Sequence, residues 1–176
     1  MSEKSKIPDS EELLSQVFGF DKSTVESNRD GKLTPEQSNR LIFTRRVYFK
    51  LAAISGVGVV ILTGILPFLP QSLTCLFSII ILSGLVFMMQ MYSLGSYLQN
   101  DLSDVQIQQV EGIIQLKPKA RYSSYRLEIQ TITFNLSDRQ FFALKNLEPY
   151  TIYFLPKSRR VLSLEWLRDY NFILEA

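Results

Sequence analysis

The sequence predicts a membrane α+β protein in which a two-helix transmembrane hairpin precedes a small β-barrel-like domain. Three observations lead to this fold class. Residues 51–100 carry no charged side chain, although 20% of the 176 residues are charged. Pro67 and Pro70 divide this uncharged stretch into two lengths that each suit one bilayer crossing. After residue 101, hydrophobic residues alternate with polar ones, which is typical of strands with one buried face.

The residue types that are missing exclude most enzyme classes. The chain contains no histidine and a single cysteine, Cys75. Catalytic Ser/His/Asp and Cys/His sets therefore cannot form within it, and neither can a zinc site built from cysteine and histidine. The carboxylate pairs Asp101/Asp104 and Glu165/Asp169 have no nucleophile or metal ligand beside them in the sequence. We predict a protein that is not an enzyme and that holds no metal or cofactor.

Residues 1–34 are predicted to form a polar N-terminal region with one short amphipathic helix. Ser10 suits the N-cap of this helix, and Gly19 suits its end. We expect the apolar face of the helix to pack on the membrane surface, on the C-terminal domain or on a partner, and residues 21–32 to form a loop. The residues of that face are Leu13, Leu14, Val17 and Phe18.

The segment from Glu26 to Gln37 resembles a calcium-binding loop of the EF-hand type, with Gly31 at the turn position. The resemblance fails at the last ligand, because Gln37 cannot supply a bidentate carboxylate. Arg29 also adds a positive charge inside the loop. We therefore interpret the segment as an acidic loop before a capped helix.

Residues 35–100 are predicted to form a capped helix and the transmembrane hairpin. A capping box around Pro35 should start a helix that continues into the membrane. We predict spans at residues 47–69 and 73–97, joined by a proline turn. A buried hairpin in a soluble bundle is the alternative, but both runs lack a polar stripe. Small residues that suit close helix packing, within the hairpin or between copies of the chain, are Ala52, Gly56 and Gly64.

Charged residues beside the hairpin predict its orientation. Arg40, Arg45, Arg46 and Lys50 crowd the start of the first span, whereas the turn between the spans carries no charge. The positive-inside rule then predicts a multi-pass protein with both termini in the cytoplasm. Because residues 51–100 contain no charged side chain, a proton relay or an ion-coupled transporter is not expected.

Residues 101–176 are predicted to form a small β domain with a C-terminal helix. Alternation predicts three strands between residues 105 and 136, then a short helix after a capping box that begins at Ser137, then two strands within residues 150–164. This order resembles that of OB-type barrels, and PH-like and SH3-like barrels are similarly compatible. Apolar residues between Leu164 and Phe172 suggest the closing helix.

Two groups of residues are candidates for contacts outside the hairpin. Basic residues near a predicted strand turn are interpreted first as a solvated turn and second as a contact with anionic lipid headgroups, with single-stranded nucleic acid the least favoured hypothesis. These residues are Lys117, Lys119 and Arg121. The candidate interaction face consists of Leu14, Phe18, Phe141 and Phe142.

We interpret the chain as an integral membrane anchor and interaction protein, a small subunit or assembly factor of a membrane complex. The hairpin would hold the β domain at the cytoplasmic membrane surface, with the bilayer and either a membrane protein or further copies of the chain as partners. The alternative is a ligand-sensing membrane effector whose β domain binds a small molecule or nucleotide and drives oligomerisation of the hairpin. A pocket inside the barrel, lined by Tyr122, Tyr125 or Tyr153, would favour this alternative.

Overall fold

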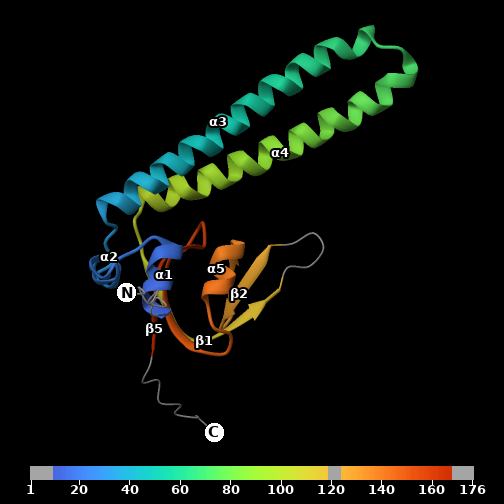
Figure 1. Cartoon of the computed structure of the whole chain (residues 1–176). Helices are drawn as coiled ribbons and strands as arrows, with labels where there is room; N and C mark the ends of the chain where they lie inside the picture. Colours follow the sequence, from blue (N-terminus) through green and yellow to red (C-terminus); the bar gives the residue numbers. More distant parts are fainter. Residues whose placement is uncertain (1–9, 119–123, 168–176) are drawn as a thin grey trace, which may run out of the picture. The chain divides into compact units, whose positions relative to one another are not determined.

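The chain folds into two compact units (Figure 1). The structure, a computed structural model, describes residues 10–118 and 124–167. Pro35–Asp104 form one unit, which we call the helical hairpin. The described residues before and after it form the other unit, which we call the sheet domain. The sheet domain is therefore built from segments on both sides of the hairpin in the sequence.

The helical hairpin consists of two long antiparallel helices. Helix α3 spans Pro35–Ile65, a short 3-10 turn η1 spans Leu66–Phe68, and α4 spans Gln71–Ser103. As predicted, the first helix begins at Pro35, and the reversal falls at the two prolines. Both helices are long and apolar enough to cross a membrane.

Small residues bring the two helices of the hairpin close together. A Cβ atom added to Gly84 would lie 2.9 Å from Val59 Cγ2, and one added to Gly95 would lie 3.1 Å from the Phe49 ring. Ser55 Oγ donates a hydrogen bond across the interface to the main-chain oxygen of Gly84, over 3.0 Å. On α4 the less exposed residues recur every three or four positions, as in a coiled-coil seam: Phe77, Ile81, Gly84, Met88, Met91, Gly95 and Leu98.

The sheet domain contains a curled antiparallel sheet in the order β3-β2-β1-β4-β5. Its strands are β1 (Gln108–Lys117), β2 (Tyr125–Ile129), β3 (Ile132–Leu136), β4 (Pro149–Leu155) and β5 (Arg160–Trp166). Strand β1 pairs with β4 through residues 108–113 and with β2 through residues 114–117, so it belongs to both halves of the sheet. The predicted order of three strands, a helix and two strands is confirmed, with α5 spanning Asp138–Ala143. The sheet forms a half-barrel with β3 and β5 at its edges.

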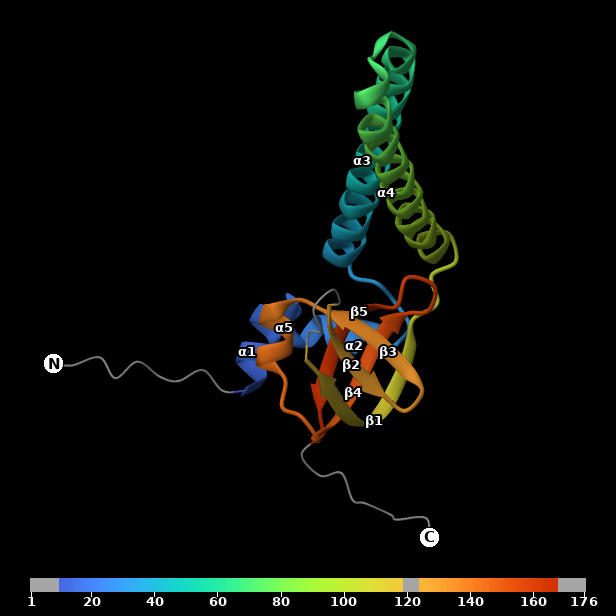
Figure 2. The same cartoon turned by 90° about the vertical axis from the view of Figure 1, so that its right-hand side faces the viewer.

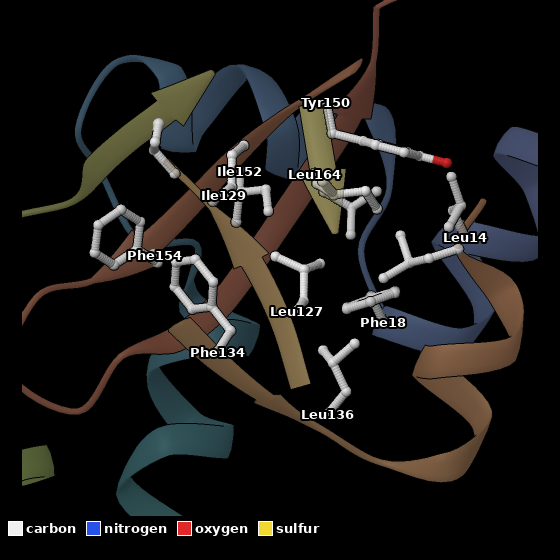
Figure 3. Packing of buried hydrophobic residues seen from close by; sticks show 13 residues of the cluster. Leu14, Phe18, Leu127, Ile129, Phe134, Leu136, Tyr150, Ile152, Phe154 and Leu164 are labelled. Atoms are coloured by element: carbon white, nitrogen blue, oxygen red, sulfur yellow. The ribbon is translucent and has the colours of Figure 1, made fainter. Parts of the chain in front are cut away.

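The hydrophobic core fills the concave side of the sheet (Figure 3). Phe134 is fully buried, and its ring packs edge-on against Phe154 with 5.0 Å between the ring centroids. Helix α1 (Ser10–Phe18) lies beside α5 (Figure 2) and contributes Leu14 and Phe18 to the same core. The N-terminal helix is thus an integral layer of the sheet domain.

Two segments differ from the sequence-based expectations. The expected loop over residues 21–32 contains a helix, α2 (Lys22–Arg29), with Asp21 as its N-cap. Its polar sequence lacks a regular apolar stripe, but Asn28 and Val25 are nevertheless buried. Glu165 and Trp166, expected in a C-terminal helix, belong to strand β5, and Leu167 follows the strand without helical structure. Residues 168–172 of that expected helix lie outside the described residues.

Candidate binding groove

A groove of about 610 Å³ lies in the sheet domain between α1, α2 and β5. Its floor is apolar, because Leu14, Val25 and Leu164 are buried there. Phe20 and Trp166 add half-buried aromatic rings. The remaining lining residues are polar or charged: Glu12, Ser15, Asp21, Lys22, Glu26, Arg29 and Glu165.

An ion-pair network forms one wall of the groove. The Arg29 guanidinium donates from Nη2 to Glu165 Oε1 and Oε2, over 2.8 and 3.1 Å. Tyr153 donates from its hydroxyl to Glu165 Oε2, over 2.9 Å. The hydrogen bond to Tyr153 and the contact with Glu165 raise the pKa of Arg29, so its charge is retained. These contacts hold α2 against β4 and β5.

One buried side-chain hydrogen bond joins α2 to the sheet. Asn28 Nδ2 donates to Ser163 Oγ over 2.7 Å, and the two residues are 2% and 0% exposed. The other amide atom, Asn28 Oδ1, is buried without a hydrogen-bond partner among the described residues. The pair fixes the register of α2 on β5, because a shift of one residue would bury an unmatched polar group.

The start of α2 carries a fixed negative charge at the groove. Asp21 Oδ1 accepts a hydrogen bond from the main-chain nitrogen of Thr24 over 2.7 Å. Hydrogen bonds from the side chain and main chain of Thr24, and from the side chain of Ser23, lower the pKa of the Asp21 carboxyl. The carboxylate is thus ionised at neutral pH and caps the helix.

The charges of the groove do not cancel. Arg29 and Glu165 form an ion pair with each other. Among the described residues, the remaining lining charges are three carboxylates, Glu12, Asp21 and Glu26, and the ammonium group of Lys22. Glu12 and Glu26 are exposed on the rim, above the apolar floor. The groove therefore combines an apolar surface with an excess of negative charge.

The predicted interaction face is divided between core and surface. Leu14 and Phe18 are 3% and 8% exposed and pack inside the domain, which leaves them unavailable to a partner. Phe141 is half-buried, and its ring centroid lies 4.3 Å from that of Tyr125. Phe142 is 74% exposed and stacks edge-on against Phe141. Of the four predicted residues, only Phe142 presents most of its side chain to solvent.

The predicted headgroup-contact residues fall partly outside the described residues. Lys117 is exposed on β1 and forms an ion pair with Glu128 over 2.6 Å. Lys119 and Arg121 lie in the segment 119–123, which the structure does not describe. The tyrosine Tyr122, named for an internal pocket, lies in the same segment.

Two of the three predicted helix-packing residues pack between the helices of the hairpin, and the third does not. Ala52 is buried, and a Cβ atom added to Gly56 would lie 3.2 Å from Met88 Sδ, so both positions pack within the hairpin. A Cβ atom added to Gly64 would meet nothing within 4 Å. Gly84 and Gly95 form closer contacts, yet the sequence pattern did not single them out.

The sequence pattern also missed the groove itself. Glu12, Arg29 and Trp166 are far apart in the chain, and neither composition nor local spacing connects them. Comparison of the chain with protein-family models, with curated proteins and with solved structures finds no match in any of the three. The functional proposal therefore depends on the geometry of this chain.

Proposed function

We propose that this chain is an integral membrane anchor and interaction protein, a small subunit or assembly factor of a membrane complex. The hairpin spans the bilayer twice, and the sheet domain contacts a membrane-protein partner at the cytoplasmic surface. The observation that carries this proposal is the outward placement of apolar side chains on the hairpin. In the most apolar window of each helix, only 6% and 0% of residues are buried.

This exposure separates the hairpin from a helical pair in a soluble core. Helices of a soluble core bury their apolar side chains, because each exposed one forgoes about 1.5–3 kcal/mol of burial free energy. Here large apolar side chains such as Phe68, Val60 and Met89 are 85%, 71% and 68% exposed. Lipid is the environment in which such a surface is stable.

Length and hydrogen bonding support the same proposal. Helices α3 and α4 have 31 and 33 residues, so at 1.5 Å per residue they are about 46 and 50 Å long, enough to cross a bilayer hydrocarbon core of about 30 Å. Hydroxyl groups within the hairpin bond to main-chain oxygens, as Thr63 does to Val59 and Ser78 to Thr74. Such internal satisfaction is required where no water is present.

The orientation in this proposal follows from the flanking charges. Arg45, Arg46 and Lys50 precede the uncharged segment, and the turn carries none. Both termini are then cytoplasmic, as is the sheet domain.

Cysteine accessibility tests the insertion and the orientation together. The chain has one cysteine, Cys75, so Cys75→Ser gives a cysteine-free background. Ser72→Cys then reports on the turn, and Thr131→Cys reports on the exposed β2–β3 turn. In spheroplasts of a bacterial host, we expect a membrane-impermeant maleimide to label Ser72→Cys directly and Thr131→Cys only after permeabilisation.

Two results would contradict the proposal. Release of the chain from membranes by alkaline carbonate would exclude stable insertion. Labelling of Thr131→Cys in unpermeabilised spheroplasts would exclude a cytoplasmic sheet domain.

A ligand-sensing membrane effector is the second candidate. The space inside the half-barrel is filled by core side chains such as Phe134, Ile114 and Ile152, each 0% exposed. The concave surface that favours a ligand is instead the groove at β5. If a soluble metabolite in millimolar amounts changed the oligomeric state of the purified chain, this second candidate would replace the first.

A further inference from the structure

One side of helix α3 changes from basic to apolar along its length. Residues that recur every three or four positions lie on the same side of a helix. On α3 this spacing joins two exposed basic residues to exposed apolar residues before and after them. We call this side the outer face of α3, and in chain order it consists of Phe43, Arg46, Lys50, Ile54, Val57 and Ile61.

The apolar part of the outer face suits lipid acyl chains. Ile54, Val57 and Ile61 are 69%, 60% and 56% exposed. In the membrane insertion proposed above, these side chains contact lipid. A spanning helix and the lipid acyl chains both run across the bilayer. A lipid that contacts Ile54 and Val57 therefore places its headgroup near the N-terminal end of the same face.

Exposed tyrosines mark the level of the headgroups. The ring centroids of Phe49 and Tyr92 are 5.8 Å apart, and a Cβ atom added to Gly95 would lie 3.1 Å from the Phe49 ring. Tyr92 and Tyr97 are 61% and 48% exposed, so both helices are level there with residues 46–50 of α3. Because tyrosine is enriched where hydrocarbon meets headgroups, residues 46–50 belong to this interface.

The basic part of the outer face carries positive charge without an acidic neighbour. Arg46 and Lys50 are exposed, and neither forms an ion pair with another described residue. The acidic residue of α3 is Glu36, which lies in the first turn of the helix. An arginine can donate two parallel N–H groups to phosphate oxygens, and a lysine can extend along apolar surface to reach them. A phosphate at this level therefore meets both side chains.

We propose that the outer face of α3 binds an anionic phospholipid, with its phosphate at Arg46 and Lys50 and an acyl chain along Ile54 and Val57. This inference rests on the proposed function, because it requires the hairpin to span a bilayer, and it names the lipid class that the hairpin selects. A zwitterionic lipid carries the same phosphate, but its headgroup also carries a positive charge, which the two basic side chains repel.

A tryptophan on the outer face reports which lipid contacts it. Ile54→Trp is introduced together with Trp166→Phe, since Trp166 is the only tryptophan of the chain. The full chain is reconstituted into vesicles of phosphatidylcholine with a minor fraction of phosphatidylglycerol, and one or the other lipid carries bromine on its acyl chains to quench fluorescence at short range. We expect phosphatidylglycerol to be preferred by about fivefold or more, the contribution of one basic side chain near a charged surface.

Helix α4 supplies a matched reporter position. Met89 is 68% exposed, and α4 carries no charged residue before Asp101. A Cβ atom added to Gly56 would lie 3.2 Å from Met88 Sδ, so Met89 and Ile54 lie at similar depth. We expect Met89→Trp to be quenched without preference for either lipid.

Charge-removing variants test which side chains select the lipid. The double variant Arg46→Gln/Lys50→Gln should remove most of the preference at Ile54→Trp. The double variant Arg139→Gln/Arg159→Gln removes the same charge from exposed positions of the sheet domain and should leave the preference unchanged. Far-UV circular dichroism in the vesicles checks that each variant stays folded.

Four results would overturn the inference. Quenching at Ile54→Trp without preference would exclude lipid selection. An equal preference at Met89→Trp would assign the enrichment to the charge of the whole chain. A preference that survives Arg46→Gln/Lys50→Gln would exclude the basic side chains. Loss of the preference in excess inorganic phosphate would assign the face to a soluble phosphate ligand.

Failure of this inference is distinguishable from failure of the proposed function. A chain that resists alkaline carbonate but shows no lipid preference contradicts only the lipid site. A chain that alkaline carbonate releases contradicts the membrane insertion itself.

Discussion

The helical hairpin and the sheet domain use similar apolar side chains in opposite ways. Phe68 in the hairpin is 85% exposed, whereas Phe134 in the sheet domain is 0% exposed. In the hairpin, small residues such as Gly84 and Gly95 face the partner helix, and many large apolar residues face outward. In the sheet domain, large residues fill the interior. The difference indicates that apolar burial stabilises the sheet domain, whereas close helix contact stabilises the hairpin.

The largest expected loss of folding stability comes from truncating a buried phenylalanine of the sheet domain, with an exposed phenylalanine of the hairpin as the matched control. Phe134→Ala should destabilise the sheet domain by about 3–5 kcal/mol, because it removes a fully buried ring and leaves a cavity. Phe68→Ala, the matched change on an exposed ring, should leave the sheet domain within about 0.5 kcal/mol of the parent. Urea unfolding of the full chain in detergent, followed by Trp166 fluorescence, measures both. Similar losses in the two variants would remove the contrast between the units.

A smaller effect is expected from adding a methyl group at the helix contact. Gly84→Ala would place Cβ 2.9 Å from Val59 Cγ2, so either the Val59 side chain or the helix backbone must shift. We expect a loss of about 1–3 kcal/mol, as for other overpacked sites. Gly64→Ala adds the same group where nothing lies within 4 Å and should cost nothing. Far-UV circular dichroism against the mole fraction of SDS in mixed micelles compares them, and equal midpoints would refute close helix contact at Gly84.

The buried hydrogen bond between Asn28 and Ser163 should contribute less to the free energy of unfolding than the contacts above. Asn28 and Ser163 are joined by a hydrogen bond of 2.7 Å, so a double-mutant cycle of Asn28→Ala and Ser163→Ala isolates it. We expect a coupling energy of about 0.5–1.5 kcal/mol in urea unfolding. Additive single effects would show that α2 is held on the sheet by its other contacts alone.

The smallest effect is expected from alkaline pH. Burial raises the pKa of Tyr153 above its ordinary value of about 10. The neutral phenol therefore stabilises the folded state fully below that ordinary value, and this contribution is lost as pH rises through the raised pKa. Between about pH 9 and 11, Tyr153→Phe should lose less stability than the parent chain. Tyr125→Phe serves as the control, and parallel stability curves for Tyr153→Phe and the parent would contradict the assignment.

Local patterns in the chain predicted most of the elements. The capping box at Ser137 and Gln140 forms with both of its hydrogen bonds, and α3 begins at Pro35. Both signals lie within a few residues, so no distant contact is needed to establish them. The helix α2 was missed because its stability depends on Asn28 and Arg29 meeting β5, more than 130 residues away in the chain.

The candidate groove could not be predicted from the sequence for the same reason. Its aromatic rings, its carboxylates and its apolar floor come from α1, the link to α2, α2 itself and β5, which no periodicity relates. For Leu14 and Phe18, the sequence predicted part of the answer. Their helical spacing correctly indicated a face that must pack, but spacing does not identify the surface against which it packs.

The sequence by itself determined the two long apolar helices, the proline reversal and the alternating strands, because these follow from residue type at short spacing. It also excluded histidine-based catalysis, since the residue is absent. Only the tertiary structure decided that the N-terminal helices belong to the sheet domain, that β1 is shared by the two halves of a half-barrel, and that a groove lies between α1, α2 and β5. The physical reason is that these features arise from contacts between distant segments, whose free energies depend on shape and complementarity in three dimensions.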